Sequence, residues 1–220
     1  MKALTVLKAS PDLVDQVYRA LLDAICDGSL APQERLRQEA IAERMGVSRQ
    51  PVLQALRQLK QDGFVQETGA RGLAVSVLDP HWMFMVYQVR GALDALAARL
   101  AAQQRAVIDP KLLARGRKAA AGKNVQAMID ADLAFHQAMY DASGNPLIGQ
   151  IALQHWQHLR RVMGAVLQQA GQRQAVWDEH AAIAEAIAHG RADHAAELVQ
   201  QHAQQAGSMM TEQLRRVAVV

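Results

Sequence analysis

The feature that most constrains the fold is the helical periodicity that fills the chain beyond Asp79-Pro80. Six segments there carry apolar residues at helical spacing, and the breaks between them contain glycine or proline. The segments are residues 81–103, 110–121, 125–142, 146–169, 174–189 and 192–216. Helices this close in sequence bury their apolar faces against one another, so we predict an all-α six-helix bundle over residues 80–220.

Residues 1–79 instead predict three helices followed by a β-hairpin. The first two helices end near Gly28 and Gly46, and two β-prone runs, 64–66 and 74–78, are joined by a glycine-rich turn. The apolar residues expected inside the first two helices are Leu13, Val17, Leu21, Leu22, Ile25, Ile41 and Met45. Helix, helix, turn, helix and wing is the order of a winged helix-turn-helix domain. We therefore predict a mainly α chain of two domains, 1–79 and 80–220.

The third helix of this domain has a proline near its start, in the sequence MGVSRQPVLQAL. If Ser48 is the N-cap, Pro51 takes the third helical position, where a missing N–H removes no intrahelical bond. Burial of Val52, Leu56 and Leu59 then turns a largely polar stripe outward, with one leucine in it. That stripe is Arg49, Gln50, Leu53, Gln54, Arg57 and Gln61.

In a helix-turn-helix, such a stripe at the start of the second helix of the motif, here the third helix of the domain, can read base edges in the major groove. Arg35, Arg37, Arg44 and Lys60 could reach phosphates, and Arg71-Gly72 lies at the wing turn, where an arginine can enter a minor groove. The predicted DNA-binding residues are Arg35, Arg37, Ser48, Arg49, Gln50, Leu53, Gln54, Arg57, Arg71 and Gly72. The alternative is that these are ordinary solvated side chains.

Composition indicates the cellular compartment more clearly than the function. The net charge is +3, and residues 1–79 hold ten Lys/Arg and ten Asp/Glu, so bulk charge gives no case for nucleic acid. A single cysteine, Cys26, excludes an internal disulfide and fits a reducing cytosol, so we expect a cytoplasmic protein. The apolar run at the N-terminus is interrupted by Lys8 and is too weak for a secretory signal, and no segment is expected to span a membrane.

Four residues in the helical half could form a metal site. Asp132 and His136 are four apart and share one face of a helix. His180 and His202 are nearly equidistant from the turn at Gly190, so an antiparallel hairpin would hold them level. One aspartate and three histidines suit Zn²⁺ or Ni²⁺, with Mn²⁺ or Fe²⁺ as further options. The alternative is a local Asp–His hydrogen bond and histidines that merely fill the bundle.

The first third of the chain resembles the GntR family of bacterial transcription regulators. The segments ICDGSLAPQERL, AIAERMGVSRQPVLQALRQLKQDGFV and ARGLAV follow the family pattern in order. The family run P-V-R-E-A-L reads P-V-L-Q-A-L here, so Leu53 and Gln54 replace an arginine and a glutamate, and Glu39 stands where arginine is common. Leu53 could contact a thymine methyl in place of a guanine, or this protein could read less sequence than its relatives.

The helical half resembles the FCD domain of the FadR subfamily, in its shorter, VanR-like branch of six helices. The segments YQVRGALDALAARLAA, DLAFHQAMYDASGNPLI and DEHAAIAEAIAHGRADHAAELVQQH carry this resemblance. It implies that Asp132, His136, His180 and His202 bind a divalent metal beside a cavity for a small organic acid. It makes Arg90 a candidate for the acid's carboxylate, with Tyr87 and Arg161 as further effector-binding candidates.

The resemblance implies a homodimer that binds a double-stranded DNA operator, responds to a small carboxylate effector and represses transcription. The rival interpretation is a metal-dependent enzyme in which the Asp/His cluster activates water, with Glu179, Asp130 or Asp178 as the base. The sequence contains no H-E-x-x-H motif, no phosphate loop and no nucleophile–base pair. We therefore predict that the chain is not an enzyme. A winged-helix adaptor whose third helix binds a protein is the third interpretation.

Overall fold

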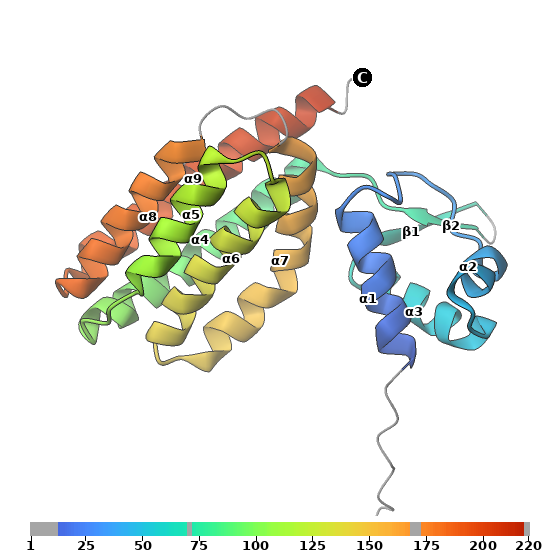
Figure 1. Ribbon diagram of the computed structural model, residues 1–220, viewed down its shortest axis with the longest axis horizontal. Coiled ribbons are helices and arrows are strands. Elements are labelled where there is room, and N and C mark those ends of the chain that lie inside the picture. The colour runs from blue at the N-terminus through green and yellow to red at the C-terminus, as the bar shows by residue number, and fades with distance from the viewer. Residues whose placement is uncertain (1–12, 70–71, 168–172, 218–220) are drawn as a thin grey trace, which may run out of the picture. The chain divides into compact units, whose positions relative to one another are not determined.

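The computed structural model describes residues 13–69, 72–167 and 173–217 (Figure 1). The chain divides into two compact units, and the boundary falls between Val77 and Leu78. The first unit contains α1 (Leu13–Cys26), α2 (Gln38–Met45), α3 (Arg49–Gln61), β1 (Val65–Thr68) and β2 (Gly72–Val75). This is the predicted winged helix-turn-helix order.

The wing is an antiparallel pair whose register runs from Val65 opposite Val75 to Thr68 opposite Gly72. The loop before α2 adds to its other edge, because Arg35 bridges to Ala74 and the Leu36 N–H donates to the Leu73 carbonyl over 2.9 Å. The second strand was predicted at 74–78, which was wrong. Pairing starts at Gly72 and ends at Val75, opposite the first residue of β1, so residues 76–78 have no β1 partner.

The core of the first unit forms where α1 packs against α3. Val52, Leu56 and Leu59 are fully buried there, as predicted. Leu13, expected in the α1 stripe, is 43% exposed, because it opens the helix beyond the part that α3 covers. Ile41 and Met45 are only half-buried. The eight-residue α2 packs against α3 through one narrow face, and the small Ala42 takes the buried position.

The second unit consists, within the described residues, of six helices, as predicted. They are α4 (Pro80–Gln103), α5 (Pro110–Ala121), α6 (Val125–Ala142), α7 (Pro146–Val166), α8 (Arg173–Ala188) and α9 (Ala192–Val217). Three of them begin alike, with a capping Asp79, Asp109 or Asn145 followed by proline. Each cap side chain accepts a hydrogen bond from a backbone N–H of the first helical turn, which has no acceptor within the helix. The proline has no N–H, and an N–H at its position would have no acceptor within the helix either.

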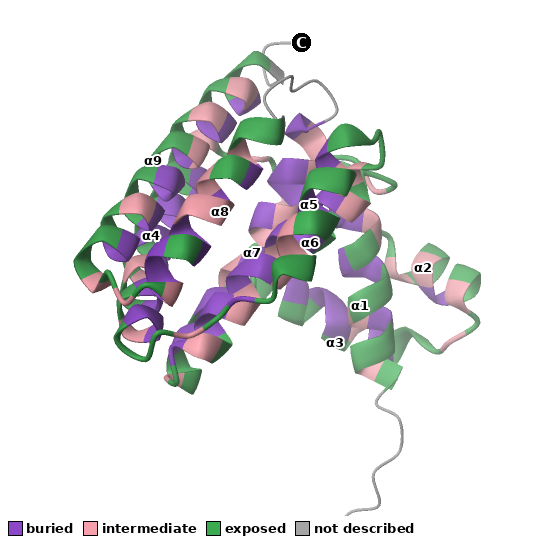
Figure 2. Cartoon of the chain, turned by 60° about the vertical axis from the view of Figure 1, so that its left-hand side comes forward, coloured by how far each residue is buried: buried purple, intermediate pink, exposed green. Residues whose placement is uncertain are grey.

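Helices α4 and α9 pack along most of their length, and small residues permit their close approach. A Cβ on Gly91 would lie 3.1 Å from Ala203 Cβ, and one on Gly207 would lie 2.8 Å from Tyr87 Cβ. Buried positions line the inner faces of the helices (Figure 2), so α6, α8 and α9 each present one side to a shared interior. Within the described residues, no helix has the length and apolar content needed to cross a bilayer.

Candidate DNA-reading helix and buried histidine site

The start of α3 is built as the sequence predicts. Ser48 occupies the N-cap position with extended backbone, although its side chain makes no capping hydrogen bond. Arg49 and Gln50 are the first two helical residues, so Pro51 is the third and removes no helical hydrogen bond. Pro51 is also buried, which makes it part of the packing between α3 and the rest of the unit.

The outward stripe of α3 is accessible. Arg49, Gln50, Gln54 and Arg57 are exposed, and Leu53 is half-buried among them. Arg49 is held by an exposed ion pair, in which its Nη1 lies 3.2 Å from Glu39 Oε1. Glu39 lies in the first turn of α2, not ahead of that helix. Such a pair is weak in water, so the guanidinium can exchange this carboxylate for a nucleic-acid acceptor.

The remaining DNA-binding candidates come from other parts of the same unit. Arg35 sits in the loop beside β2 and Arg37 at the N-cap of α2, and both are exposed. Lys60, expected to reach phosphate, pairs with Glu67 on β1 at 2.5 Å. Arg71 lies outside the described residues. At Gly72 a Cβ would lie 2.5 Å from the Thr68 carbonyl oxygen, so only glycine fits at this first residue of β2.

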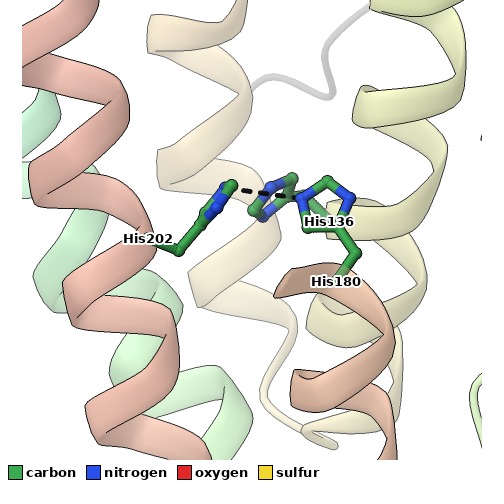
Figure 3. Close-up of side chains that lie close together, drawn as sticks. All are labelled: His136, His180 and His202. Carbon is green, nitrogen blue, oxygen red and sulfur yellow. Dashed lines mark hydrogen bonds between the residues drawn. The ribbon is translucent and has the colours of Figure 1, made fainter. Parts of the chain in front are cut away.

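Three histidines from three helices meet inside the second unit (Figure 3). His136 comes from α6, His180 from α8 and His202 from α9, and a nitrogen of each lies within 4.8 Å of the other two. His180 Nε2 and His202 Nε2 are 3.3 Å apart, which agrees with their equal distances from the α8–α9 turn. All three imidazoles are buried.

Asp132 supplies a carboxylate to the same place. Its Oδ1 lies 3.6 Å from His180 Nε2 and 3.9 Å from His136 Nε2. Ligand atoms bound to one tetrahedral ion at about 2.1 Å lie about 3.4 Å apart. The separations among these donors, 3.3, 3.6 and 3.9 Å, are close to that value. The structure therefore brings the three histidines together within 4.8 Å, at a spacing that a divalent ion can use, and places Asp132 beside two of them, His136 and His180.

Two further carboxylates lie beside these imidazoles, and the one beside His202 is hydrogen-bonded to it. Glu179 Oε2 lies 2.6 Å from His202 Nδ1, and Asp94 Oδ2 lies 3.3 Å from His136 Nδ1. A carboxylate on Nδ1 directs the lone pair of Nε2 toward the shared centre, which is the usual outer arrangement around metal-binding histidines. The sequence analysis missed Asp94. Its only signal is its place one turn after Arg90, on a buried helix face.

Asp94 and Arg90 form a buried network on α4. Asp94 accepts a hydrogen bond from Tyr140 Oη over 2.5 Å and one from Arg90 Nε over 3.2 Å. Arg90 Nη2 lies 2.6 Å from His136 Nε2, and its Cζ stands 4.7 Å from the Trp156 ring centroid. Burial by itself raises the pKa of Asp94, but His136 and Arg90 outweigh it and hold that pKa at about 2. Asp94 is thus an anion at neutral pH.

Two of the histidines, His136 and His180, are neutral for a related reason. Burial, and next the positive charge of Arg90, lower the pKa of His136. Burial, and next His202, lower the pKa of His180 well below its ordinary value. A neutral imidazole keeps a free lone pair, which a metal ion needs. The donor set suits a divalent ion, which would compete with Arg90 Nη2 for the Nε2 lone pair of His136.

A cavity of about 70 Å³ opens beside this cluster. Its polar lining is Tyr87, Arg90, Asp132 and His202, and methionine, leucine, valine and tryptophan side chains provide most of the rest. A cavity of this volume holds a small molecule. Arg161 is buried on α7 but is not among the lining residues, whereas the other two predicted effector contacts, Arg90 and Tyr87, both are.

The chain thus combines a winged helix-turn-helix unit with a separate all-helical unit that holds a buried polar site. Two family models match the chain, "Bacterial regulatory proteins, gntR family" over residues 13–75 and "FCD domain" over residues 85–205. The second model alone covers more than half of the sequence. The chain therefore belongs to the gntR family of bacterial regulatory proteins and carries an FCD domain.

Individual relatives agree with this assignment. The chain is 30% identical over 135 residues to an uncharacterized HTH-type transcriptional regulator, YdhC of Bacillus subtilis, covering 59% of this chain and 60% of that protein. It is 36% identical over 73 residues to the Nta operon transcriptional regulator of Aminobacter aminovorans, covering 33% of this chain and 35% of that protein. These matches span less than two thirds of either relative.

Solved structures show the same fold. E. coli McbR/YncC superposes with a TM-score of 0.75 at 19% identity, over 94% of this chain and 99% of that one. A GntR-type putative transcriptional regulator from Rhodococcus sp. RHA1 gives 0.72 at 24% identity, over 90% and 96%.

Proposed function

We propose that this protein is a metabolite-responsive transcription regulator that binds operator DNA through α3 in the cytoplasm and represses transcription. The observation that carries the proposal is the exposed stripe at the start of α3, with Arg49 and Gln50 first, in a chain of the gntR family. Arginine and glutamine can each make paired hydrogen bonds to a purine, guanine and adenine respectively. Arg35 and Arg37 are exposed near the same unit's wing and α2, and are proposed to bind phosphate.

The test is binding to the DNA upstream of the protein's own gene, measured by fluorescence anisotropy at several salt concentrations. We expect binding that weakens steeply as salt rises, because cations released from phosphates drive association. A double variant, Arg49→Ala with Gln50→Ala, should lose the preference for this DNA over random duplex. Arg99→Ala removes an exposed arginine of the helical unit and is the matched control. Equal binding by the double variant and the wild type contradicts the proposal.

We further propose that the four-residue cluster binds a divalent metal, zinc or nickel first, and that the adjacent cavity takes a small carboxylate. A bound ion would supply a Lewis acid that attracts the carboxylate. Arg90 and Tyr87 line the same cavity, and Arg90 can donate to carboxylate oxygens from within the protein. Elemental analysis of the purified protein, before and after chelator, tests the ion. A thermal shift with short carboxylic acids tests the ligand.

The enzymatic alternative needs a free general base beside the ion. Glu179 is engaged with His202 Nδ1 at 2.6 Å, and Asp178 pairs with Arg117 at 3.2 Å. Asp130 is exposed and accepts a hydrogen bond from the Gln126 amide. Each of the three acids considered for that role is therefore held by another partner. We accordingly propose a sensor without turnover, which predicts that a bound acid is recovered unchanged.

A homodimer completes the proposed function, and one surface of the second unit supports it. Exposed apolar side chains lie on α4 and on the neighbouring α7, and Trp82 contacts His158 across the two helices at 4.4 Å. The exposed members that share one side of each helix by helical spacing are Trp82, Met85, Val89 and Leu96 on α4 and Leu147 and Ile151 on α7. The charged residues of α4 before Arg99 are Arg90 and Asp94, both buried. Two copies can therefore join these faces without burying a charge.

Sedimentation velocity tests the dimer. Val89 is 48% exposed in the middle of this apolar face, so Val89→Asp should give a monomer at micromolar concentration. Val107→Asp, at a position 76% exposed between α4 and α5, is the control and should leave the dimer intact. A dimer that survives Val89→Asp places the interface elsewhere.

A further inference from the structure

Arg90 lies close to two of the proposed metal ligands, where its positive charge disfavours the binding of a metal ion. Its Nη2 lies 2.6 Å from His136 Nε2 and 3.8 Å from Asp132 Oδ2. Both of these residues are proposed metal ligands, and an N–H that donates to Nε2 uses the lone pair that an ion needs. An ion bound through His136 Nε2 and Asp132 Oδ1 therefore takes away the hydrogen-bond acceptor of Nη2 and leaves it 3.8 Å from Asp132 Oδ2.

The rest of the guanidinium is fixed. Its Nε pairs with Asp94 Oδ2 at 3.2 Å, Asp94 is itself held by Tyr140, and the group stacks over Trp156. Arg90 is only 4% exposed. Arg90 thus cannot leave the site for water when an ion arrives. It remains close to the ion as a second positive charge, and its Nη2 has lost the His136 Nε2 acceptor.

A ligand in the adjacent cavity can offset both unfavourable effects, the repulsion between the ion and Arg90 and the loss of an acceptor for Nη2. Arg90, Asp132 and His202 all line it, so a carboxylate placed there lies between the guanidinium and the ion's position. An anion in that place accepts from the orphaned Nη2 and neutralises the repulsion between the two cations. The lining of the cavity is otherwise mostly apolar, which strengthens these charge interactions.

We propose that Arg90 makes metal and acid binding mutually dependent: it weakens the ion's binding on its own and strengthens it once a carboxylate is bound. The inference rests on the proposed metal and acid site. Because linkage is reciprocal, the acid must raise metal affinity by the same factor by which metal raises acid affinity. Arg90 is then more than a contact for the acid, since it makes the protein respond to the pair instead of to either one alone.

The test measures Zn²⁺ affinity by competition with a chromophoric chelator, first with the metal alone. Arg90→Gln removes the competing cation and keeps a side chain that can hydrogen bond to Asp94. We expect it to bind Zn²⁺ at least tenfold more tightly than the wild type. Arg90→Lys retains the charge and should stay within a few-fold of the wild type. Arg99→Gln, on an exposed turn of the same helix, is the control for general charge. Circular dichroism and thermal unfolding establish that each variant is folded.

The second arm repeats the titration with acetate as the probe carboxylate. We expect acetate to raise Zn²⁺ affinity about fivefold or more in the wild type and to have little effect in folded Arg90→Gln. Equal or weaker metal binding by Arg90→Gln overturns the inference, as does the same acetate effect in both proteins. Zn²⁺ bound by neither protein overturns the metal site as well, whereas DNA binding through α3 is tested independently of both outcomes.

Discussion

In the winged-helix unit the buried core contains only apolar side chains and Cys26, whereas the helical unit buries arginine, aspartate and histidine. Each of the buried charged or polar residues within the described part of the chain lies in the helical unit. The difference fits the ligands proposed for the two units. Duplex DNA is too large to enclose, so its contacts stay on the surface, while an ion and a small acid can be surrounded. Substitutions of binding residues in the first unit should therefore change DNA binding without changing the free energy of unfolding. In the second unit they should change both ligand binding and the free energy of unfolding.

The largest effect is expected at His180. Its ring stacks on Phe135 at 4.2 Å and meets Trp177 at 4.8 Å, so His180→Ala removes a proposed ligand and leaves a hole between two aromatic rings. We expect loss of bound metal and a fall of about 2–3 kcal/mol in the free energy of unfolding. Elemental analysis and urea unfolding measure the two. A variant that retains a full equivalent of metal would remove His180 from the ligand set.

Arg49→Ala should show the opposite behaviour. Loss of a base or phosphate contact weakens DNA binding by about 1–3 kcal/mol. The exposed ion pair with Glu39 contributes little, so the free energy of unfolding should change by less than about 0.5 kcal/mol. Anisotropy titration and urea unfolding of the same preparation give both numbers. If Arg49→Ala unfolds more easily by several times that amount, the contrast between the two units fails.

Leu53→Arg tests whether a side chain on the outward stripe of α3 contacts a base. The side chain is half-buried on the outward stripe, so an arginine at this position can reach the groove without entering the core. If Leu53 contacts a thymine methyl, the substitution should change the preferred base at one operator position by about 1 kcal/mol or more. Selection of binding sites from a random pool measures this preference. An unchanged operator would mean that Leu53 reads no base.

The sequence predicted more of the fold than of the site because the two depend on different information. Helix starts at Asp79, Asp109 and Asn145, each followed by proline, are local and appear directly in the letters. The wing was misplaced by two residues at its second strand, since register depends on which residues face each other across the turn.

The histidine site was predictable only in part. Asp132 with His136 follows from helical spacing, and His180 with His202 from equal distances to a turn. Spacing cannot show that Asp94 from α4 reaches the His136 ring, because that contact depends on how α4 and α6 pack. The same holds for Arg90, whose nearness to a proposed ligand atom appears only in three dimensions.

The smallest effect concerns two residues at helix starts, one in each unit. Ser48 occupies the N-cap position of α3 but makes no capping hydrogen bond, whereas the Asn124 side chain accepts the Ala127 N–H at the start of α6 over 3.0 Å. Asn124→Ala should lower the free energy of unfolding by about 1 kcal/mol, the usual value of a cap. Ser48→Ala should change it by less than about 0.5 kcal/mol.

Ser48 should instead matter for DNA, because its free hydroxyl at a helix start can donate to a phosphate. We expect Ser48→Ala to weaken operator binding two- to fivefold, about 0.5–1 kcal/mol at 25 °C, which is what one neutral hydrogen bond contributes. Asn124→Ala should leave operator binding unchanged when both proteins are compared well below their unfolding temperatures. Ser48→Ala that destabilises the protein as much as Asn124→Ala, with DNA binding intact, would show that the hydroxyl caps the helix and does not face the duplex.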